Sequence, residues 1–399
     1  MTVPAAPRAL SVRELGRASL ARQHLLTPAD RRGAAASTPT PGGLHDPSAD
    51  VLAEITHLVG LQSQAPDPPY VGLWTRLDAF DPQTLSTLLT ERHVVRIALM
   101  RGTVHLVTAD DAPVLHALLR PLFVRQLRTS SQHARHLLDL DLDDLAAAGR
   151  DALHAAPLSP ADLGRALAPR WPDVPPAALA QGVRGLLPLV QVPPRGVWRA
   201  RGGTGTRWTT AESWLGRTTP ELTDTDERRS VLAAVALRYL AAFGPAGVAD
   251  IQRWSGLTAL AGVVDALRPQ LVSFTGPDGR ELLDLPDAPR PSVDTPAPVR
   301  FLPAWDNLLL SHVNRERIIT EDRRAAMFSV NGIVAPSLIV DGAVVGRWDL
   351  RTAPGSATLE VTLLVARLTA AQREQTEAEG LRLLALLAGP TAQVRVVVT

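Results

Sequence analysis

The feature that most constrains the fold is one order of secondary structure that occurs twice along the chain. In its first occurrence, helical spacing over 143–155 is followed by a short helix beginning at Ser159-Pro160 and by another over 176–186. Pro- and Gly-rich turns then separate three strand-like segments, 189–192, 197–200 and 207–209. Helix, turn, helix and β-hairpin is the order of a winged helix, a small fold that commonly binds DNA.

Residues 228–285 show the same order again. A long helix and a helix-turn-helix cover 228–267, and the segments 271–274 and 281–285 flank a Gly-Pro-Asp-Gly turn that suits a hairpin. The two stretches share this architecture without a clear sequence repeat. We therefore expect an α+β fold built from tandem winged-helix domains.

The N-terminal part contains a linker followed by a helix that begins at an Asp-Pro pair. Residues 33–47 are rich in Pro, Gly, Ser and Thr, and Asp46-Pro47 then begins a helix with apolar residues at i, i+3 and i+4. Three prolines between 66 and 69 forbid its continuation. A helix near 82–90 and a strand-like run over 94–107 follow.

The C-terminal part is predicted to be rich in β-structure. After a proline-rich linker at 286–298, a hairpin turns at Asp341-Gly342, and strands at 357–365 and 393–398 flank a helix over 369–387. We expect three winged-helix modules and one β-rich region, with the bounds 9–125, 126–220, 226–290 and 295–399.

Composition restricts the partners and the chemistry. The formal net charge is only +1, so any nucleic-acid surface must be a local stripe of positive charge. The chain has no lysine, so all 41 basic side chains are arginines, whose forks suit phosphate and guanine. It has no cysteine, which excludes disulfides, thiolate metal sites and cysteine nucleophiles. Without a membrane-length apolar run or a signal pattern, we expect a cytoplasmic protein.

Gln62 and Gln64 are the first candidates for chemistry because of their position. They end an apolar helix and precede the proline-broken loop. In an extended segment, residues two apart share a face, so the two carboxamides could hold one water molecule between them. The alternative is two polar residues that close a helix, and the pattern by itself favours that alternative.

Other polar candidates gather at three places. In the strand-like run, Arg101, Thr103 and His105 alternate and should share one face, with Arg96 nearby, either to touch DNA or to form a solvated face. Two further groups are Arg201 and Arg207 in a Gly-rich wing tip, and Asp306, His312, Arg315 and Arg317 after Trp305. We find no HExxH, GxSxG, Walker A or dinucleotide motif, so we predict no metal and no cofactor.

Five segments together resemble the AlkZ/AlkX-type winged-helix DNA glycosylases. They occur in the expected order and span nearly the whole chain. They are GLQSQ (60–64), VRIALMRGTVHLV (95–107), FGPAGVADIQRWSGL (243–257), FLPAWDNLLLSH (301–312) and NGIVAPSLIVDGAVVGRW (331–348). Each is weak alone, and the set is specific.

The resemblance implies a C-shaped DNA clamp and a catalytic Gln-Φ-Gln motif, where Φ is an apolar residue. The motif maps onto Gln62, Ser63 and Gln64, with a small polar serine at the middle position. Glutamine rather than aspartate at the third position is closer to relatives that give self-resistance to DNA-alkylating antibiotics. Asn314 stands where an acidic residue is expected before Arg315.

The implied function is a monofunctional DNA glycosylase, a monomer acting on double-stranded DNA near the nucleoid. Alkylation at N7 or N3 makes a purine a good leaving group, so neutral amides need only place water at C1′, and the adducts include bulky ones and interstrand crosslinks. Without lysine, no side-chain amine can form the Schiff base of a strand-cutting enzyme. We expect an open cleft, with the hairpin 341–348 and its Arg347 near the lesion.

Two other functions remain open from the sequence. Winged helices also occur in transcription regulators, and nothing in their order proves catalysis. A protein that sequesters the drug without excising a base would also protect a producer. Release of an alkylated base from duplex DNA separates the glycosylase from both.

Overall fold

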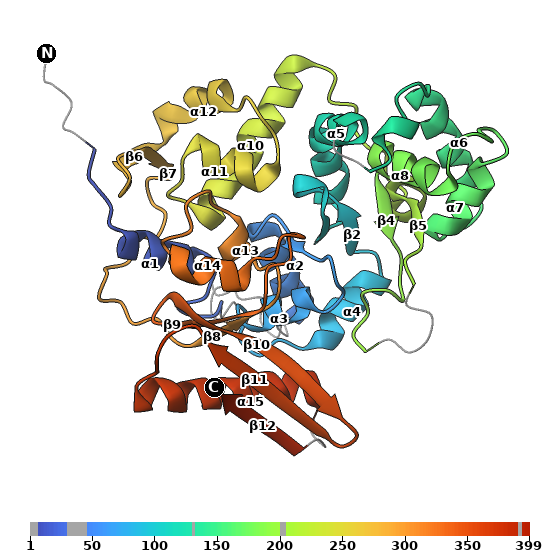
Figure 1. Ribbon diagram of the computed structural model, residues 1–399. Helices are drawn as coiled ribbons and strands as arrows, with labels where there is room; N and C mark the ends of the chain where they lie inside the picture. Colours follow the sequence, from blue (N-terminus) through green and yellow to red (C-terminus); the bar gives the residue numbers. More distant parts are fainter. Residues whose placement is uncertain (1–6, 30–45, 130–131, 200–204, 390–392) are drawn as a thin grey trace, which may run out of the picture.

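The structure is a computed structural model that describes residues 7–29, 46–129, 132–199, 205–389 and 393–399. Within these residues the strands form two five-stranded sheets and one two-stranded hairpin, with helices around them (Figure 1). The fold is therefore mixed α/β with a β-rich C-terminal part, as predicted. No helix in these ranges is long and apolar enough to cross a membrane.

The N-terminal part supplies the first three strands of the central sheet. Its elements are α1 (Val12–Arg22), α2 (Pro47–His57), β1 (Leu61–Gln62), α3 (Pro68–Trp74), α4 (Pro82–Thr90), β2 (Val94–Ala98) and β3 (Val104–Thr108). The expected starts of α2 and α4 are confirmed, since Asp46 and Asp81 accept from backbone N–H groups two residues on. Helix α3 was not predicted, because the prolines taken as breakers occupy its first turn, where proline is tolerated.

The central sheet has the order β1-β3-β2-β4-β5. Its last two strands, β4 (Leu189–Gln191) and β5 (Trp208–Thr210), come from much later in the chain, and β4 pairs with β2 through Ile97 and Val190. The sheet thus continues across the module boundary expected at 125/126. Helix α5 (Asp111–Thr129), which was not predicted, packs on β2 and β3 and buries apolar residues in their core.

Helices precede and follow β4 in the middle of the chain. They are α6 (Leu142–His154), α7 (Pro160–Leu167), α8 (Pro176–Leu186) and α9 (Ala211–Leu215). The predictions for α6, α7 and α8 are confirmed, and Ser159 caps α7 by accepting from the Asp162 N–H. The strand expected at 197–200 is absent from its described residues, 197–199, which form turns. Arg201 and most of the Gly-rich segment lie outside the described residues.

The next elements follow the predicted helix-turn-helix and hairpin. They are α10 (Thr225–Phe243), α11 (Val248–Ser255), α12 (Ala261–Leu267), β6 (Val272–Thr275) and β7 (Glu281–Asp284). Strands β6 and β7 pair antiparallel around the Gly-Pro-Asp-Gly turn. Helix α11 ends at Ser255, and the next residue, Gly256, has a φ of 82°, the left-handed conformation that favours glycine.

The C-terminal sheet has the order β12-β11-β10-β9-β8 and lies at one end of the molecule (Figure 1). Its strands are β8 (Arg300–Leu302), β9 (Ser337–Val340), β10 (Ala343–Ala353), β11 (Ser356–Leu363) and β12 (Gln393–Val398). Helix α15 (Ala370–Ala388) packs on the sheet and joins β11 to its parallel neighbour β12. The predicted turn at Asp341-Gly342 joins β9 to β10, as expected.

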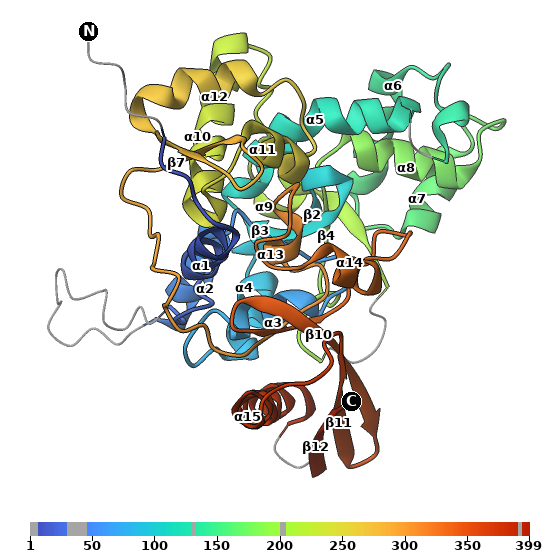
Figure 2. The ribbon, with the colours of Figure 1, turned by 60° about the vertical axis from the view of Figure 1, so that its left-hand side comes forward.

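The segment between β8 and β9 leaves this sheet and carries α13 (Asn307–Leu310) and α14 (Glu321–Met327) back to the centre of the molecule (Figure 2). There Asn307 donates from Nδ2 to the carbonyl of Gly60, 2.9 Å away. Asp306 accepts two hydrogen bonds from Arg76, at 2.7 and 2.9 Å, and both side chains are almost fully buried. This contact fixes the segment against β1 and α3.

Candidate active site

Strand β1 ends in the glutamine motif, and its neighbour β3 fixes the register. Gln62 lies opposite His105 in this antiparallel pair, and the Ser63 N–H donates to the Val104 carbonyl at 2.7 Å. Gly60 precedes the strand with a φ of 96°, and a Cβ there would lie 2.5 Å from Cγ1 of Val107. Glycine is therefore required for the approach of β1 to β3.

Gln62 is held by an arginine. Its side chain is only 6% exposed, and Oε1 accepts a hydrogen bond of 2.8 Å from Nη2 of Arg101. Because a guanidinium group only donates, the atom facing Arg101 must be the carbonyl oxygen. The amide orientation of Gln62 is thus fixed, with Nε2 directed away from Arg101 and one lone pair of Oε1 left over.

Gln64 has different surroundings. It is exposed, and its Oε1 accepts from the backbone N–H of Val104 at 3.3 Å, which closes the hydrogen-bond ladder where β1 stops. It lines a cleft of about 700 Å³, which is also lined by Arg165 on α7 and by Gln181 and Arg184 on α8. We call Gln64 with these three residues the cleft side of the site.

Ser63 turns to the opposite face of β1, where Arg96 holds it. Arg96 donates from Nε to Ser63 Oγ at 2.9 Å and from Nη2 to its carbonyl at 2.7 Å. Arg96 is 1% exposed, and burial, helped by the charge of Arg195, lowers its pKa to about 10. The expectation of a DNA contact does not fit this buried position, where Arg96 instead supports the strand between the two glutamines.

The run 94–107, read from the sequence as one strand, is a hairpin. Its turn, Met100–Gly102, places Arg101 in the left-handed region with a φ of 59°. From there Arg101 reaches Gln62 with Nη2 and donates to the Trp254 carbonyl at the end of α11 with Nη1. Burial, together with the charges of Arg253 and Arg315, lowers the pKa of Arg101 to about 10.

His105 is buried, and Thr103 is partly buried and bonded to its own turn. His105 is 1% exposed, and its Nδ1 lies 3.0 Å from the Thr103 carbonyl. Burial and then the charge of Arg101 lower its pKa to about 3, so His105 is neutral near pH 7. Thr103 donates from Oγ1 to the Met100 carbonyl at 3.1 Å. The expected shared face of Arg101, Thr103 and His105 is therefore not formed, because the first two lie in the turn and its exit.

Three of the candidates among the residues after Trp305, namely Asp306, His312 and Arg315, are buried. Asp306 and His312 are 4% and 2% exposed, and His312 Nε2 lies 2.9 Å from the Phe243 carbonyl. Burial first, then the charge of Arg317, holds the pKa of His312 well below its usual value. Both residues pair with protein groups, which does not fit the expected DNA contact. Arg315 is 9% exposed and its guanidinium lies 4.8 Å over the Phe328 ring.

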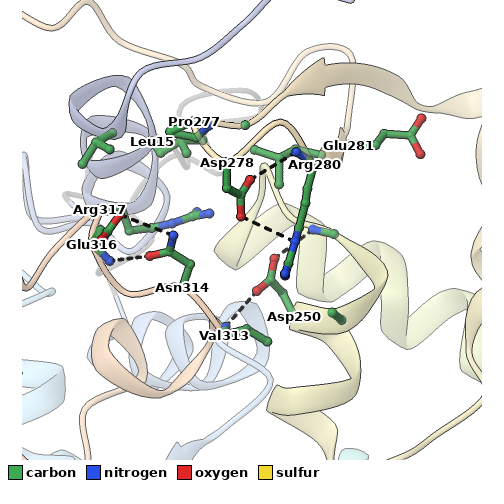
Figure 3. Close-up of a pocket in the computed structure, with 15 residues that line it drawn as sticks. Leu15, Asp250, Pro277, Asp278, Arg280, Glu281, Val313, Asn314, Glu316 and Arg317 are labelled. Carbon is green, nitrogen blue, oxygen red and sulfur yellow. Dashed lines mark hydrogen bonds and ion pairs between the residues drawn. The ribbon is translucent and has the colours of Figure 1, made fainter. Parts of the chain in front are cut away.

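Asn314 and Arg317 belong to a small separate cavity of about 60 Å³ (Figure 3). The cavity lies between α1, the start of α11 and the turn of the β6–β7 hairpin. Asp250 accepts from the Val313 N–H at 2.8 Å, and Asn314 Oδ1 accepts from the Glu316 N–H at 2.8 Å. Neither glutamine lines this cavity, whose contacts anchor the backbone on either side of Arg315.

The remaining expected contacts lie farther along the chain. Arg207 is exposed and donates from Nη1 to the Pro157 carbonyl at 3.0 Å. Arg347 is exposed on β10, but the turn of its hairpin is held by α1, since Asp341 forms ion pairs with Arg13 and Arg17. The expected placement of this turn near a lesion does not fit that contact.

The structure also brings residues to the site that the sequence did not single out. Arg253 on α11 is near enough to Arg101 and Arg315 to lower the pKa of each. We call Gln62 with Arg101, Arg253 and Arg315 the arginine side of the site. From the sequence, Arg253 could be recognised only as an arginine within the predicted helix-turn-helix. No group of metal-ligating side chains occurs among the described residues.

Known proteins resemble this chain in sequence and in fold. The family model for DNA glycosylase AlkZ-like proteins matches residues 55–386. A protein of Streptomyces sahachiroi, the "Interstrand DNA cross-link repair glycosylase", is 26% identical over 125 residues. This alignment covers 28% of the present chain and 32% of that relative.

The fold also matches a solved structure, the Streptomyces sahachiroi DNA glycosylase AlkZ. The TM-score is 0.71 at 18% identity, over 98% of this chain and 100% of that chain. At this identity the match establishes the fold alone, and the family model carries the assignment. The chain therefore belongs to the AlkZ-like DNA glycosylase family.

Proposed function

We propose that this protein is a monofunctional DNA glycosylase that hydrolyses the N-glycosidic bond of purines alkylated at N7 or N3. The observation that carries the proposal is the end of β1, where Gln62 accepts a hydrogen bond from Arg101, one of a group of arginines, and Gln64 lines a wide cleft. Membership of a DNA glycosylase family supports the reaction class.

The two glutamines suit a substrate that is already activated. Alkylation gives the purine a positive charge, so it leaves without a protein acid. Each glutamine Oε1 is engaged by one donor, Arg101 or the Val104 N–H, and keeps a second lone pair for a water hydrogen. The amides then orient water toward C1′ as the sugar develops positive charge, while the neighbouring phosphates stabilise that charge.

The reaction stops at an abasic site. Strand cleavage by a glycosylase needs an amine that forms a Schiff base with the opened sugar. The chain has no lysine, and the neutral His105 is buried against protein. We therefore assign no lyase step to the site.

The substrate is double-stranded DNA held by a monomer in the cytoplasm, near the nucleoid. The helix-turn-helix pairs α7–α8 and α11–α12 with their hairpins act in this proposal as winged helices of a C-shaped clamp. A cleft of about 700 Å³ beside Gln64 is open enough for bulky adducts. The relative named for interstrand crosslink repair supports such adducts, including crosslinks from alkylating antibiotics, as substrates.

A base-release assay tests the proposal. Duplexes carrying 7-methylguanine or a bulky N7 adduct are incubated with the protein, and free base and strand breaks are measured separately. We expect free base and an abasic strand that breaks only after heat or alkali. Binding without base release from any adduct would contradict the proposal, and strand breaks formed by the pure protein would contradict the monofunctional reaction.

A further inference from the structure

The guanidinium group of Arg101 contacts Gln62, and two further arginines, Arg253 and Arg315, approach Arg101 from separate parts of the chain. Arg101 comes from the β2–β3 turn, Arg253 from α11, and Arg315 from the segment after α13. The turn and the end of α11 are in close contact, since a Cβ on Gly256 would lie 3.2 Å from the Cα of Arg101. Arg253 on α11 therefore lies close to Arg101. The segment that carries Arg315 is tied to the same helix, because Asp250 of α11 accepts from the Val313 N–H at 2.8 Å.

Two of these side chains are held in place while the third is available. Arg101 donates to Gln62 and to the Trp254 carbonyl, and Arg315 donates from Nε to the Leu309 carbonyl at 2.7 Å. Arg253 is exposed and has no hydrogen bond or ion pair within the described part of the chain. The fold thus holds two charges beside a free one.

Among the described residues, no carboxylate forms an ion pair with Arg101 or raises its pKa. Besides burial, the groups that shift its pKa are Arg253 and Arg315, which are both cationic. The charge of Glu321 raises the pKa of Arg315, whereas the charges of Arg253 and Arg324 lower it. Like charges that are held together raise the free energy of the protein until an anion joins them. Arginine forks favour anions with several oxygens, such as phosphate.

The proposed reaction makes such an anion necessary. The sugar becomes cationic as the base leaves, so an unneutralised arginine group beside Gln62 would repel it and slow the reaction. A phosphate bound to the arginines reverses the sign of this effect. Through Arg101, which contacts Gln62 at 2.8 Å, the phosphate would also be linked to the water-orienting amide.

We infer that Arg101, Arg253 and Arg315 form a binding site for one backbone phosphate next to the damaged nucleotide. This inference rests on the proposed function and deepens it. Arg101 and Arg315 supply fixed donors, and Arg253 closes on the phosphate from the exposed end of α11. The site binds the backbone, so it is independent of DNA sequence.

A neutral-phosphate scan tests the inference. One phosphate at a time near a 7-methylguanine is replaced by an uncharged methylphosphonate, and single-turnover release of the base is measured. The wild-type protein should lose about tenfold in rate at one or two adjacent positions. Arg253→Gln should be about tenfold slower on unmodified DNA and lose nothing further at those positions. Arg229→Gln removes the same charge from α10, where Asp226 pairs with it at 2.9 Å, and should behave as wild type throughout.

A binding measurement gives a second readout that does not need catalysis. The slope of log affinity against log salt should fall by about one for Arg253→Gln and stay unchanged for Arg229→Gln. A salt slope that stays unchanged in Arg253→Gln would overturn the phosphate site. So would rate losses from Arg253→Gln and from methylphosphonate that multiply at every position, because the two changes would then act independently. If wild type releases no base from any alkylated duplex, the proposed function fails, and the salt slope alone still decides whether the phosphate is bound.

Discussion

The two glutamines of the motif are held with different rigidity. On the arginine side, Gln62 is 6% exposed and is held by a charged donor at 2.8 Å. On the cleft side, Gln64 is exposed and is held by one backbone N–H at 3.3 Å. Two glutamines only two residues apart, one in β1 and one just after it, are therefore in opposite surroundings. We infer that Gln62 is the fixed group of the reaction and that Gln64 adjusts to what fills the cleft.

The support beneath the arginine side gives the largest expected effect. Replacing Asp306 by alanine leaves Arg76 charged and fully buried without its partner, so the protein should lose about 3–5 kcal/mol of unfolding free energy. Denaturant unfolding measures this loss. Asp349→Ala, at an exposed position on β10, should change stability by less than about 0.5 kcal/mol. Unchanged stability with weakened DNA binding in Asp306→Ala would instead restore the surface role expected from the sequence.

Removal of the donor to Gln62 should give the next largest effect. Arg101→Ala frees the Gln62 amide to rotate, and single-turnover base release should fall about 100-fold. Because Arg101 and Gln62 act as a unit, the double variant with Gln62→Ala should be no slower than either single variant. Losses that multiply in the double variant would show that the two residues act independently.

The cleft side should tolerate change better. Gln64→Ala removes one neutral, partly solvated hydrogen-bonding group, so we expect base release to fall by about tenfold or less. The loss should be larger on a bulky N7 adduct than on 7-methylguanine, because the adduct occupies the cleft that Gln64 lines. Equal losses on both substrates would remove the distinction between the two sides.

The smallest expected effect is that of pH on the rate. Glutamine does not titrate, and the pKa of His105 is about 3, so base release should change by less than about twofold between pH 6 and 8.5. A bell-shaped profile with a pKa near 6.5 would reveal an acid or base that this site lacks.

Stability should respond to pH although the rate does not. Burial lowers the pKa of both His105 and His116 to about 3, so the unfolded chain binds their protons first. Unfolding free energy should be constant above about pH 6.5 and fall as pH drops below it, by at most about 1.4 kcal/mol per unit for each histidine. Denaturant unfolding at pH 7 and pH 5 measures this difference.

The sequence predicted the parts of the fold that depend on local signals. The helix over 176–186 and the strand over 393–398 were predicted with the bounds of α8 and β12, because periodicity and turn residues specify them. The pairing of β2 with β4 could not be predicted, since it joins residues about 90 positions apart. The turn within 94–107 could not be recognised from the sequence, because Leu99 and Met100 are apolar like the strands around them. Only tertiary contacts place Arg101 in this turn.

Only part of the candidate site could be predicted, because some of its contacts join distant segments of the chain. The glutamines were singled out as the end of an apolar helix, but this helix ends earlier, at His57, and Gln62 lies in the strand β1. Gln64 does line a cleft. Arg96, Asp306 and His312 looked like surface residues because charged and polar side chains usually lie outside. Their partners Ser63, Arg76 and the Phe243 carbonyl come from distant segments and allow their burial.

The most direct test of this account compares Gln62→Ala with Gln64→Ala in two measurements on one 7-methylguanine duplex. We expect Gln62→Ala to release base about 100-fold more slowly than wild type, with DNA affinity within about twofold of it, and to be clearly slower than Gln64→Ala. Wild-type rates in Gln62→Ala, or equal losses of affinity in both variants, would show that the buried amide supports structure and does not take part in the reaction.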